Sequence, residues 1–367
     1  MPRRGAVAAG AVALACAVEL LSQRPASYAA YVATPDELAR AEAYLAANLA
    51  PLPDRWRWRD RAVPGGFVRT GEAGERGAPT VLFVPGFTGT AEQYADYYAA
   101  WTARGWRVVA LDLPGQGGSM RRPHVPGEWG NPELPWSDDF GAYAEAIAPV
   151  LAEEAARGPL VVVGESFGGH VVLRALAEAE EHLADAAVLV VPALDAETND
   201  VPRALALGTA HAARALGFGG AYAAGTGPWA PGAGIAAAAD GAEGPGRCGD
   251  RADRLGLQSA LYAREPGLRV SGPSWGWLAG LQASGARLAR PGVAGRVRLP
   301  VFMVQSGQDR VVRNGRASAA CDAMADCERM VWDDTSHCLG VEEQEIQDRL
   351  HGVIARAMAR AAGWAAR

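Results

Sequence analysis

The chain has 367 residues, of which 49% are hydrophobic and 21% charged, as in a globular protein that buries a full core. Its net charge of −6 argues against binding to a nucleic acid, which requires a basic surface. All 35 basic residues are arginine, which excludes phosphate-loop lysines, Schiff-base lysines and Ser-Lys dyads. Cys-x-x-Cys and His-Glu-x-x-His spacings are absent from the sequence, so we expect no metal site.

Residues 1–29 have the pattern of a secretory signal peptide or N-terminal anchor. Two arginines precede an apolar run from Gly5 to Val18 that is shorter than a membrane-spanning helix requires. The sequence Ala-Ser-Tyr-Ala, ending at Ala29, offers a cleavage site. We therefore expect the protein to be exported or anchored on the periplasmic side. An amphipathic N-terminal helix of a cytoplasmic protein is the alternative.

A capped helix is predicted over 34–49, because Thr34 and Pro35 precede acidic residues. From residue 79 onward, apolar runs typical of buried strands alternate with segments of helical period. The predicted strands are 80–86, 106–115, 159–166, 186–194, 299–307 and 328–334, and the predicted helices between them include 90–105, 137–158 and 169–184. This alternation predicts an α/β fold, a mostly parallel sheet with helices on both faces.

Residues 195–297 interrupt this alternation. The interval contains no convincing strand and is rich in Ala, Gly, Pro and Trp. Since it separates two sheet strands, it predicts an inserted helical cap. The expected core is then made of residues 30–194 and 298–367.

Two of the cysteines lie close together in the sequence. Cys321 and Cys327 flank the end of a predicted helix. In an oxidising compartment they could form a disulfide, and buried free thiols are the alternative.

The segment Gly-Glu-Ser-Phe-Gly at 164–168 matches the Gly-x-Ser-x-Gly motif of a nucleophile elbow. An apolar strand precedes it and a helix follows it, which is the context that this motif requires. The alternative is a small residue in a tight, glycine-rich turn. We interpret Ser166 as the nucleophile.

A serine hydroxyl needs a base that is itself oriented by a carboxylate, and in this architecture the chain order is Ser, acid, His. His337 follows the last predicted strand on a short loop before the final helix, where the base is expected. Five other histidines fit this position poorly and are interpreted as surface or core residues: His124, His170, His182, His211 and His351.

The acid is expected after the penultimate strand. Asp309 stands there, just past a glycine turn. Asp195 and the adjacent Asp333 and Asp334 are rivals, but the last two lie too close to His337 in sequence to approach it from the far side. An oxyanion would be held by two main-chain amides, those of Phe167 and, with less support, Phe87.

Together these segments resemble α/β-hydrolases of the monoacylglycerol lipase and lysophospholipase group, of the serine aminopeptidase S33 type. The resemblance is carried by VPGFTGTAEQY, LDLPGQGGSMR, GESFGG, SGQDRVV and TSH, in this order, and covers about residues 60–360. Two departures are Glu165, where the group commonly has His before the serine, and a PGFTG loop without the usual His-Gly.

The resemblance implies an α/β-hydrolase fold and a serine esterase without a cofactor. Ser166 would attack an ester carbonyl, His337 would transfer the proton to the leaving alcohol, and Asp309 would stabilise the imidazolium. The substrate would be a small-molecule or lipid ester such as a monoacylglycerol or lysophospholipid, and association with a membrane surface would suit it.

The predicted cap would set specificity. Trp275 and Trp277 could line an acyl site or serve plain packing. Four arginines could face a phosphate head group or be solvated on helix faces: Arg251, Arg254, Arg264 and Arg269.

Two other functions remain open at this point. An aminopeptidase-like amide hydrolase would use the same triad, and an acidic cluster binding the free amine would favour it. The segment LDAETND at 194–200 is a weak candidate for such a cluster. A catalytically silent binding protein would use the same scaffold, but the complete Ser, Asp, His order argues against it.

Overall fold

A computed structural model describes residues 30–121, 131–135, 139–198, 201–230 and 251–365. The strands are β1 (Arg57–Val63), β2 (Gly66–Ala73), β3 (Thr80–Val84), β4 (Arg107–Leu111), β5 (Leu160–Glu165), β6 (Ala186–Val190), β7 (Val301–Ser306) and β8 (Cys327–Trp332). The helices are α2 (Pro35–Asn48), α3 (Ala95–Thr102), α4 (Phe140–Ala155), α5 (Phe167–Glu178), α6 (Arg203–Ala215), α8 (Ala252–Leu255), α9 (Leu257–Arg264), α10 (Trp275–Leu288), α11 (Pro291–Ala294), α12 (Asn314–Ala323) and α13 (Gln344–Ala365). Three short 3-10 helices are η1 (Ala91–Tyr94), η2 (Pro266–Leu268) and η3 (Leu339–Val341).

The eight strands form one sheet in the order β1-β2-β4-β3-β5-β6-β7-β8. Strands β3 to β8 pair in parallel, and β2 pairs antiparallel with both β1 and β4. The predicted α/β class and parallel sheet are therefore confirmed. The β1–β2 hairpin was not predicted, because its first strand is arginine-rich and exposed and carries no apolar run.

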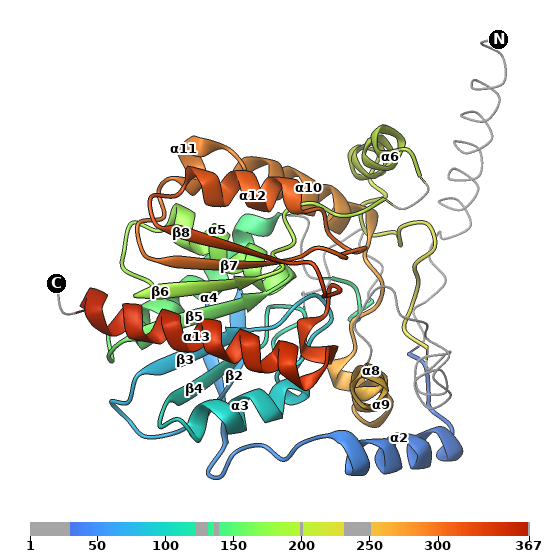
Figure 1. Ribbon diagram of the computed structural model, residues 1–367. Coiled ribbons are helices and arrows are strands. Elements are labelled where there is room, and N and C mark those ends of the chain that lie inside the picture. The colour runs from blue at the N-terminus through green and yellow to red at the C-terminus, as the bar shows by residue number, and fades with distance from the viewer. Residues whose placement is uncertain (1–29, 122–130, 136–138, 199–200, 231–250, 366–367) are drawn as a thin grey trace.

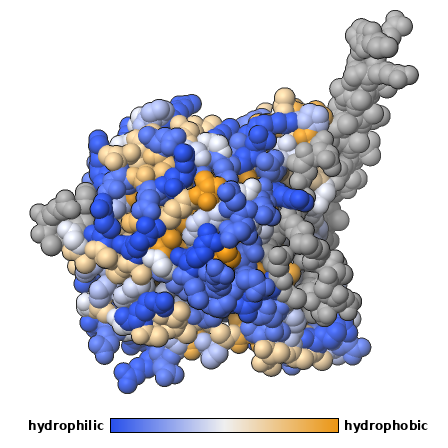
Figure 2. Space-filling view, viewed as in Figure 1, coloured by the Kyte–Doolittle hydropathy of each residue, from blue (hydrophilic) through white to orange (hydrophobic). Residues whose placement is uncertain are grey.

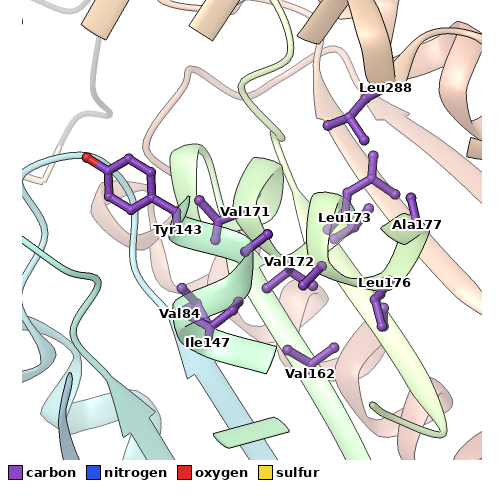
Figure 3. Close-up of a cluster of buried hydrophobic side chains, with 14 of the residues drawn as sticks. Val84, Tyr143, Ile147, Val162, Val171, Val172, Leu173, Leu176, Ala177 and Leu288 are labelled. Atoms are coloured by element: carbon purple, nitrogen blue, oxygen red, sulfur yellow. The ribbon is translucent and has the colours of Figure 1, made fainter. Parts of the chain in front are cut away.

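Helices cover both faces of the sheet (Figure 1). One apolar layer joins α3 and α13 to the sheet, and the other joins α4, α5, α10 and α12 to it. Figure 3 shows part of the second layer, where Val171 and Val172 of α5 lie near Ile147 of α4 and Val162 of β5. Continuous apolar strands such as β3 and β5 are buried along their whole length because both faces are covered.

Helix α13 lies across the front of the molecule in the view of Figure 1. Its residues Ile346, Leu350 and Ile354 are buried against the sheet. Figure 2 shows that this face of the molecule is mostly hydrophilic, with smaller hydrophobic patches between. Among the described residues, none of the helices is both long and apolar enough to span a membrane.

The N-terminal helix α2 begins with a capping box. Thr34 accepts from the Glu37 amide, and the Glu37 carboxylate accepts from the Thr34 amide at 2.7 Å. Its buried face, Ala41 and Leu45, packs against Leu261 of α9. The predicted helix over 34–49 is confirmed, while the predicted signal segment lies outside the described residues.

The interval predicted as a cap contains α6 and α8 to α11, and the part of it that the structure describes contains no strand. Its helices do not form one unit. Helix α9 packs on α2, whereas Trp277 and Leu281 of α10 lie in the core layer with α4 and α5. The boundaries 195 and 297 remain a prediction, and α10 within them contributes to the hydrolase core.

Cys321, near the end of α12, and Cys327, at the start of β8, form a disulfide. A loop of this length is expected to contribute about 2 kcal/mol by restricting the unfolded chain. Replacing both cysteines with serine should lower the free energy of unfolding by about that amount, measured by urea denaturation. The same variant tested in reducing buffer is the control, since there the difference between the two proteins should shrink; an unchanged difference would contradict the prediction.

Candidate active site

Ser166 stands between β5 and α5, with φ 52° and ψ −113°. This left-handed conformation is costly for a residue with a side chain and is held by its surroundings. The Ser166 amide donates to the Val190 carbonyl at 2.8 Å, and its carbonyl accepts from the amides of His170 and Ala193. The sharp turn directs the hydroxyl away from the sheet at the carboxyl end of β5.

Glycines on both sides make the turn possible. A Cβ on Gly164 would lie 2.7 Å from the Cα of Gly169, and one on Gly168 would lie 2.2 Å from the Val84 carbonyl oxygen. Both contacts are with backbone that cannot swing aside. Each glycine of the motif is therefore required for steric reasons, which argues against a chance match of the sequence.

The structure brings the three predicted residues together. His337 Nε2 lies 2.9 Å from Ser166 Oγ, and His337 Nδ1 lies 2.7 Å from Asp309 Oδ2. The other oxygen of Asp309 accepts from the amides of Val311 and Val312, both at 2.8 Å. The His337 and Asp309 side chains are only 8% and 2% exposed, so these bonds are shielded from water.

The rival acids have other partners. Asp195 binds Arg203 at 2.5 Å, and Asp334 binds Arg349 at 2.7 Å. Among the rejected histidines, buried His170 contacts the Ala193 carbonyl and Ser284, and burial lowers its pKa to about 4. It is a neutral core histidine, as the sequence predicts. His124 lies outside the described residues.

The loop after β3 carries the second predicted oxyanion donor, Phe87. The next residue, Thr88, has φ +64°, and its amide donates to the Gln116 side chain at 2.8 Å. The Gln116 amide nitrogen donates in turn to the Gly86 carbonyl at 3.1 Å. Tyr262 donates to the Thr88 carbonyl at 2.6 Å.

Gln116 therefore fixes the loop beside Ser166. Sequence reasoning missed this role, because the polar Gln116 reads as one residue of a Gly-rich turn. Its position in PGQGGS, directly after the β4 run, was the only available signal.

Ser166 and His337 line a cavity of about 300 Å³. The cavity's apolar lining comes from Phe87, Leu255, Leu257, Val311 and Val341. Its polar lining includes Gln93, Tyr94, Glu165, Arg254 and Gln258. The site thus places a candidate nucleophile in a cavity with a mixed apolar and polar lining.

Glu165 is the unusual polar residue of the lining, since its carboxyl directly precedes the candidate nucleophile Ser166. It is buried, and its Oε2 atom has no hydrogen-bond partner among the described residues. Burial raises the pKa of this carboxyl, although the Tyr94 hydroxyl, His337 and Arg254 oppose the shift.

The raised pKa predicts how stability depends on pH. Folded Glu165 keeps its proton at pH values where the unfolded chain has lost it, so the contribution of Glu165 to the free energy of unfolding should fall as pH rises above about 4.5. The Glu165→Gln side chain does not ionise, so this decrease in stability with rising pH is absent in the variant. The free energy of unfolding of Glu165→Gln should therefore rise relative to wild type from acidic to neutral pH. Glu145→Gln, on the exposed side of α4, is the control. A constant difference between Glu165→Gln and wild type would contradict the prediction.

The two tryptophans predicted for an acyl site do not line this cavity. Both are buried. Trp277 packs 4.3 Å from the Phe87 ring and also against Phe167, and Trp275 lies in a small cluster with α6. Trp277 thus packs α10 against the core beside the Phe87 loop, whereas Trp275 packs α10 against α6.

The four arginines considered for a phosphate head group differ in their positions and partners. Only Arg254 lines the cavity. It already binds Asp96, with one contact at 3.1 Å. Arg251 pairs with Asp253, Arg264 with Glu265, and Arg269 is buried against the Trp229 ring and the Tyr262 carbonyl.

Comparison with known proteins identifies the family of the chain. Residues 76–344 match the family described as serine aminopeptidase, S33. The chain is 26% identical to lysophospholipase L2 of Escherichia coli K12 over 294 residues, which cover 77% of this chain and 80% of that protein.

Solved structures with the same fold include two lipases. The monoacylglycerol lipase of Paleococcus ferrophilus has a TM-score of 0.57 at 15% identity, covering 80% of this chain and 99% of its own. A soluble variant of the Saccharomyces cerevisiae monoglyceride lipase has a TM-score of 0.62 at 13% identity, covering 84% and 97%. The chain therefore belongs to the serine aminopeptidase S33 family and is a hydrolase with the α/β-hydrolase fold.

Proposed function

We propose that this chain is a carboxylic ester hydrolase that uses Ser166, His337 and Asp309 on a lipid-like ester. The observation that carries the proposal is the continuous hydrogen-bonded chain from Asp309 through His337 to Ser166, which ends in a cavity. The names of the related lysophospholipase and monoacylglycerol lipases support the ester class.

In the proposed reaction, His337 Nε2 accepts the Ser166 proton as Oγ attacks the ester carbonyl. Asp309 accepts from Nδ1, which keeps the proton off Nε2 and stabilises the imidazolium. The amides of Phe87 and Phe167 would hold the oxyanion. His337 then protonates the leaving alcohol, and water activated by the same residue releases the acid.

The lining of the cavity supports a monoacylglycerol or lysophospholipid. Five apolar side chains of the lining offer a surface for an acyl chain, and polar side chains line the same cavity. An acyl ester with a polar alcohol matches this mixed lining.

An aminopeptidase needs a free acidic group near the nucleophile for the substrate amine. Asp195 and Glu197 of the 194–200 segment bind Arg203 and Arg313, and neither lines the cavity. That segment therefore offers no such group, whereas Glu165 does line the cavity. The ester assignment is favoured by the names of the related lysophospholipase and monoacylglycerol lipases.

The test uses the purified full chain and a fluorophosphonate probe. Wild type should be labelled and should release fatty acid from monoacylglycerol or lysophospholipid. Ser166→Ala should lose both properties, while Ser318→Ala on α12 keeps them. Failure of wild type to react with the probe would overturn the serine mechanism. Cleavage of aminoacyl anilides without ester cleavage would overturn the substrate class.

We also infer that the protein is exported, which would bring it to membrane lipids. The signal-like residues 1–29 and the Cys321–Cys327 disulfide support this, because disulfides persist in oxidising compartments. Fractionation of cells that express the full chain should recover it outside the cytoplasm, and deletion of residues 2–29 should retain it inside. Recovery of the full chain from the cytoplasm would contradict the inference.

A further inference from the structure

A second cavity, of about 360 Å³, lies at the opposite edge of the sheet from Ser166. Its lining includes Thr80 and Arg107, where β3 and β4 begin, whereas Ser166 follows the end of β5. Since these strands are parallel, the two cavities lie at opposite edges. The side chains of five arginines and one glutamate line it: Arg57, Arg59, Arg76, Arg107, Arg157 and Glu72.

The inner arginines are held by buried carboxylates. Arg107 is 6% exposed and binds Glu72 at 2.5 Å and also Glu154. Arg61 binds the same Glu154 at 2.6 Å. Arg59 binds Glu72 at 2.8 Å. These pairs fix the guanidinium groups in place before any ligand arrives.

The strand geometry concentrates the charge. Arg57, Arg59 and Arg61 alternate along β1, so they share one face of the sheet. Arg57 stands opposite Glu72 in the register of β1 and β2. One carboxylate therefore lies within 4 Å of four arginines, because Arg57 and Arg61 approach Glu72 at 3.8 and 3.9 Å.

Two exposed arginines of the lining, Arg57 and Arg76, have guanidinium N–H groups that are available to hydrogen bond with a ligand. The Arg57 side chain is 57% exposed, and its ion pair with Glu72 is long at 3.8 Å. Arg76 is exposed and makes no hydrogen bond or ion pair with any residue that the structure describes. Both can turn toward a ligand in the cavity without breaking a buried contact.

The loop that connects β2 and β3 closes one side of the cavity. Gly74 has φ +97°, and a Cβ there would lie 2.7 Å from the Cα of Arg107, so this turn lies directly against the start of β4. Gly77 has φ +85° and open space where a Cβ would stand.

The charges in and directly behind the lining do not balance. With Arg61, Glu75, Glu153 and Glu154 included, six arginines face four glutamates, an excess of two positive charges in a chain whose net charge is −6. Such an excess attracts an anion with several oxygens.

We propose that this cavity binds a small phosphorylated anion, whose oxygens accept from the guanidinium groups of Arg57, Arg59 and Arg76. The buried Arg107 also lines this site. Guanidinium forks match phosphate oxygens in geometry and charge. The volume of the cavity falls within the range of small-molecule sites. This site is separate from the proposed ester chemistry.

The test measures binding of inorganic pyrophosphate to the full chain by isothermal titration calorimetry. The double variant Arg57→Ala/Arg76→Ala should bind at least about tenfold more weakly, because two charged donors are lost without touching the buried pairs. The matched control is Arg290→Ala/Arg296→Ala, which removes two exposed arginines near α11. Its affinity should stay within about twofold of wild type. All three proteins should hydrolyse ester equally, which shows that they are folded.

No measurable binding by wild type, or an equal loss in both double variants, would overturn the proposal. A second arm distinguishes free from lipid phosphates. Vesicles of phosphatidylcholine with one third phosphatidylglycerol are sedimented with each protein, with and without pyrophosphate. Co-sedimentation that pyrophosphate and Arg57→Ala/Arg76→Ala both abolish assigns the site to lipid head groups. Pyrophosphate binding without co-sedimentation assigns it to soluble phosphoanions.

Discussion

Asp309→Asn should lower kcat for ester hydrolysis by about 10⁴-fold near neutral pH. The amides of Val311 and Val312 both donate to Asp309 Oδ1, so they would orient the asparagine with its oxygen toward them. The asparagine NH₂ group would then face His337 Nδ1 and donate to it. This forces the proton of neutral His337 onto Nε2, where it can no longer accept the Ser166 proton.

The measurement is kcat at saturating ester for wild type, Asp309→Asn and Asp334→Asn. Asp334 is close to His337 in the sequence but pairs with Arg349 on the surface, so its variant should keep activity within about twofold. Far-UV circular dichroism checks that each variant is folded. Equal activities for Asp309→Asn and wild type would refute Asp309 as the orienting acid.

Gly168→Ala should destabilise the fold by about 1–3 kcal/mol or more. The new methyl group would lie 2.2 Å from the Val84 carbonyl oxygen and 2.5 Å from that of Pro85. Both are backbone atoms at the end of β3, so α5 must shift away from the sheet. Because α5 begins at the nucleophile, this shift should also slow labelling of Ser166.

The matched control is Gly352→Ala in α13. This glycine is also helical but has no atom within 4 Å of an added Cβ. Alanine there should leave stability unchanged or raise it by up to about 1 kcal/mol. Urea denaturation of both variants gives the comparison. A similar change in both would show that Gly168 is not sterically required.

The residues of the candidate site could be found in the sequence because each follows a recognisable strand. The apolar runs before Ser166, Asp309 and His337 identify parallel strands, whose carboxyl ends meet at one edge of the sheet. Strand order in the chain then limits which acid and which histidine can reach the serine.

Residues that do not follow a recognisable strand could not be assigned to the site from the sequence. Trp275 and Trp277 offer aromatic surface for an acyl chain, but both are buried elsewhere in the fold. Trp277 packs against Phe87 in the core layer, and Trp275 packs in a small cluster with α6. Likewise, only the folded chain shows that Arg254, out of four arginines in the same region, reaches the cavity.

Glu165 and the PGFTG loop depart from the pattern of the related group. Their structural surroundings are visible only in the folded protein. Glu165 reads in the sequence as a substitution next to the nucleophile. In the fold it is a buried carboxyl that faces Tyr94 and shares the cavity with Ser166. The unusual PGFTG loop is fixed by Gln116, which lies 28 residues from Thr88 in the chain.

By itself the sequence determined the α/β class, the strands of the parallel core along the chain and the three residues of the candidate triad. These depend on local signals, namely apolar period, glycine spacing and chain order. The tertiary structure decided that Cys321 and Cys327 pair, which residues line the cavity and that arginines cluster at the far edge of the sheet. The cavity and the arginine cluster join residues far apart in the chain, and all three features depend on packing geometry that no local pattern encodes.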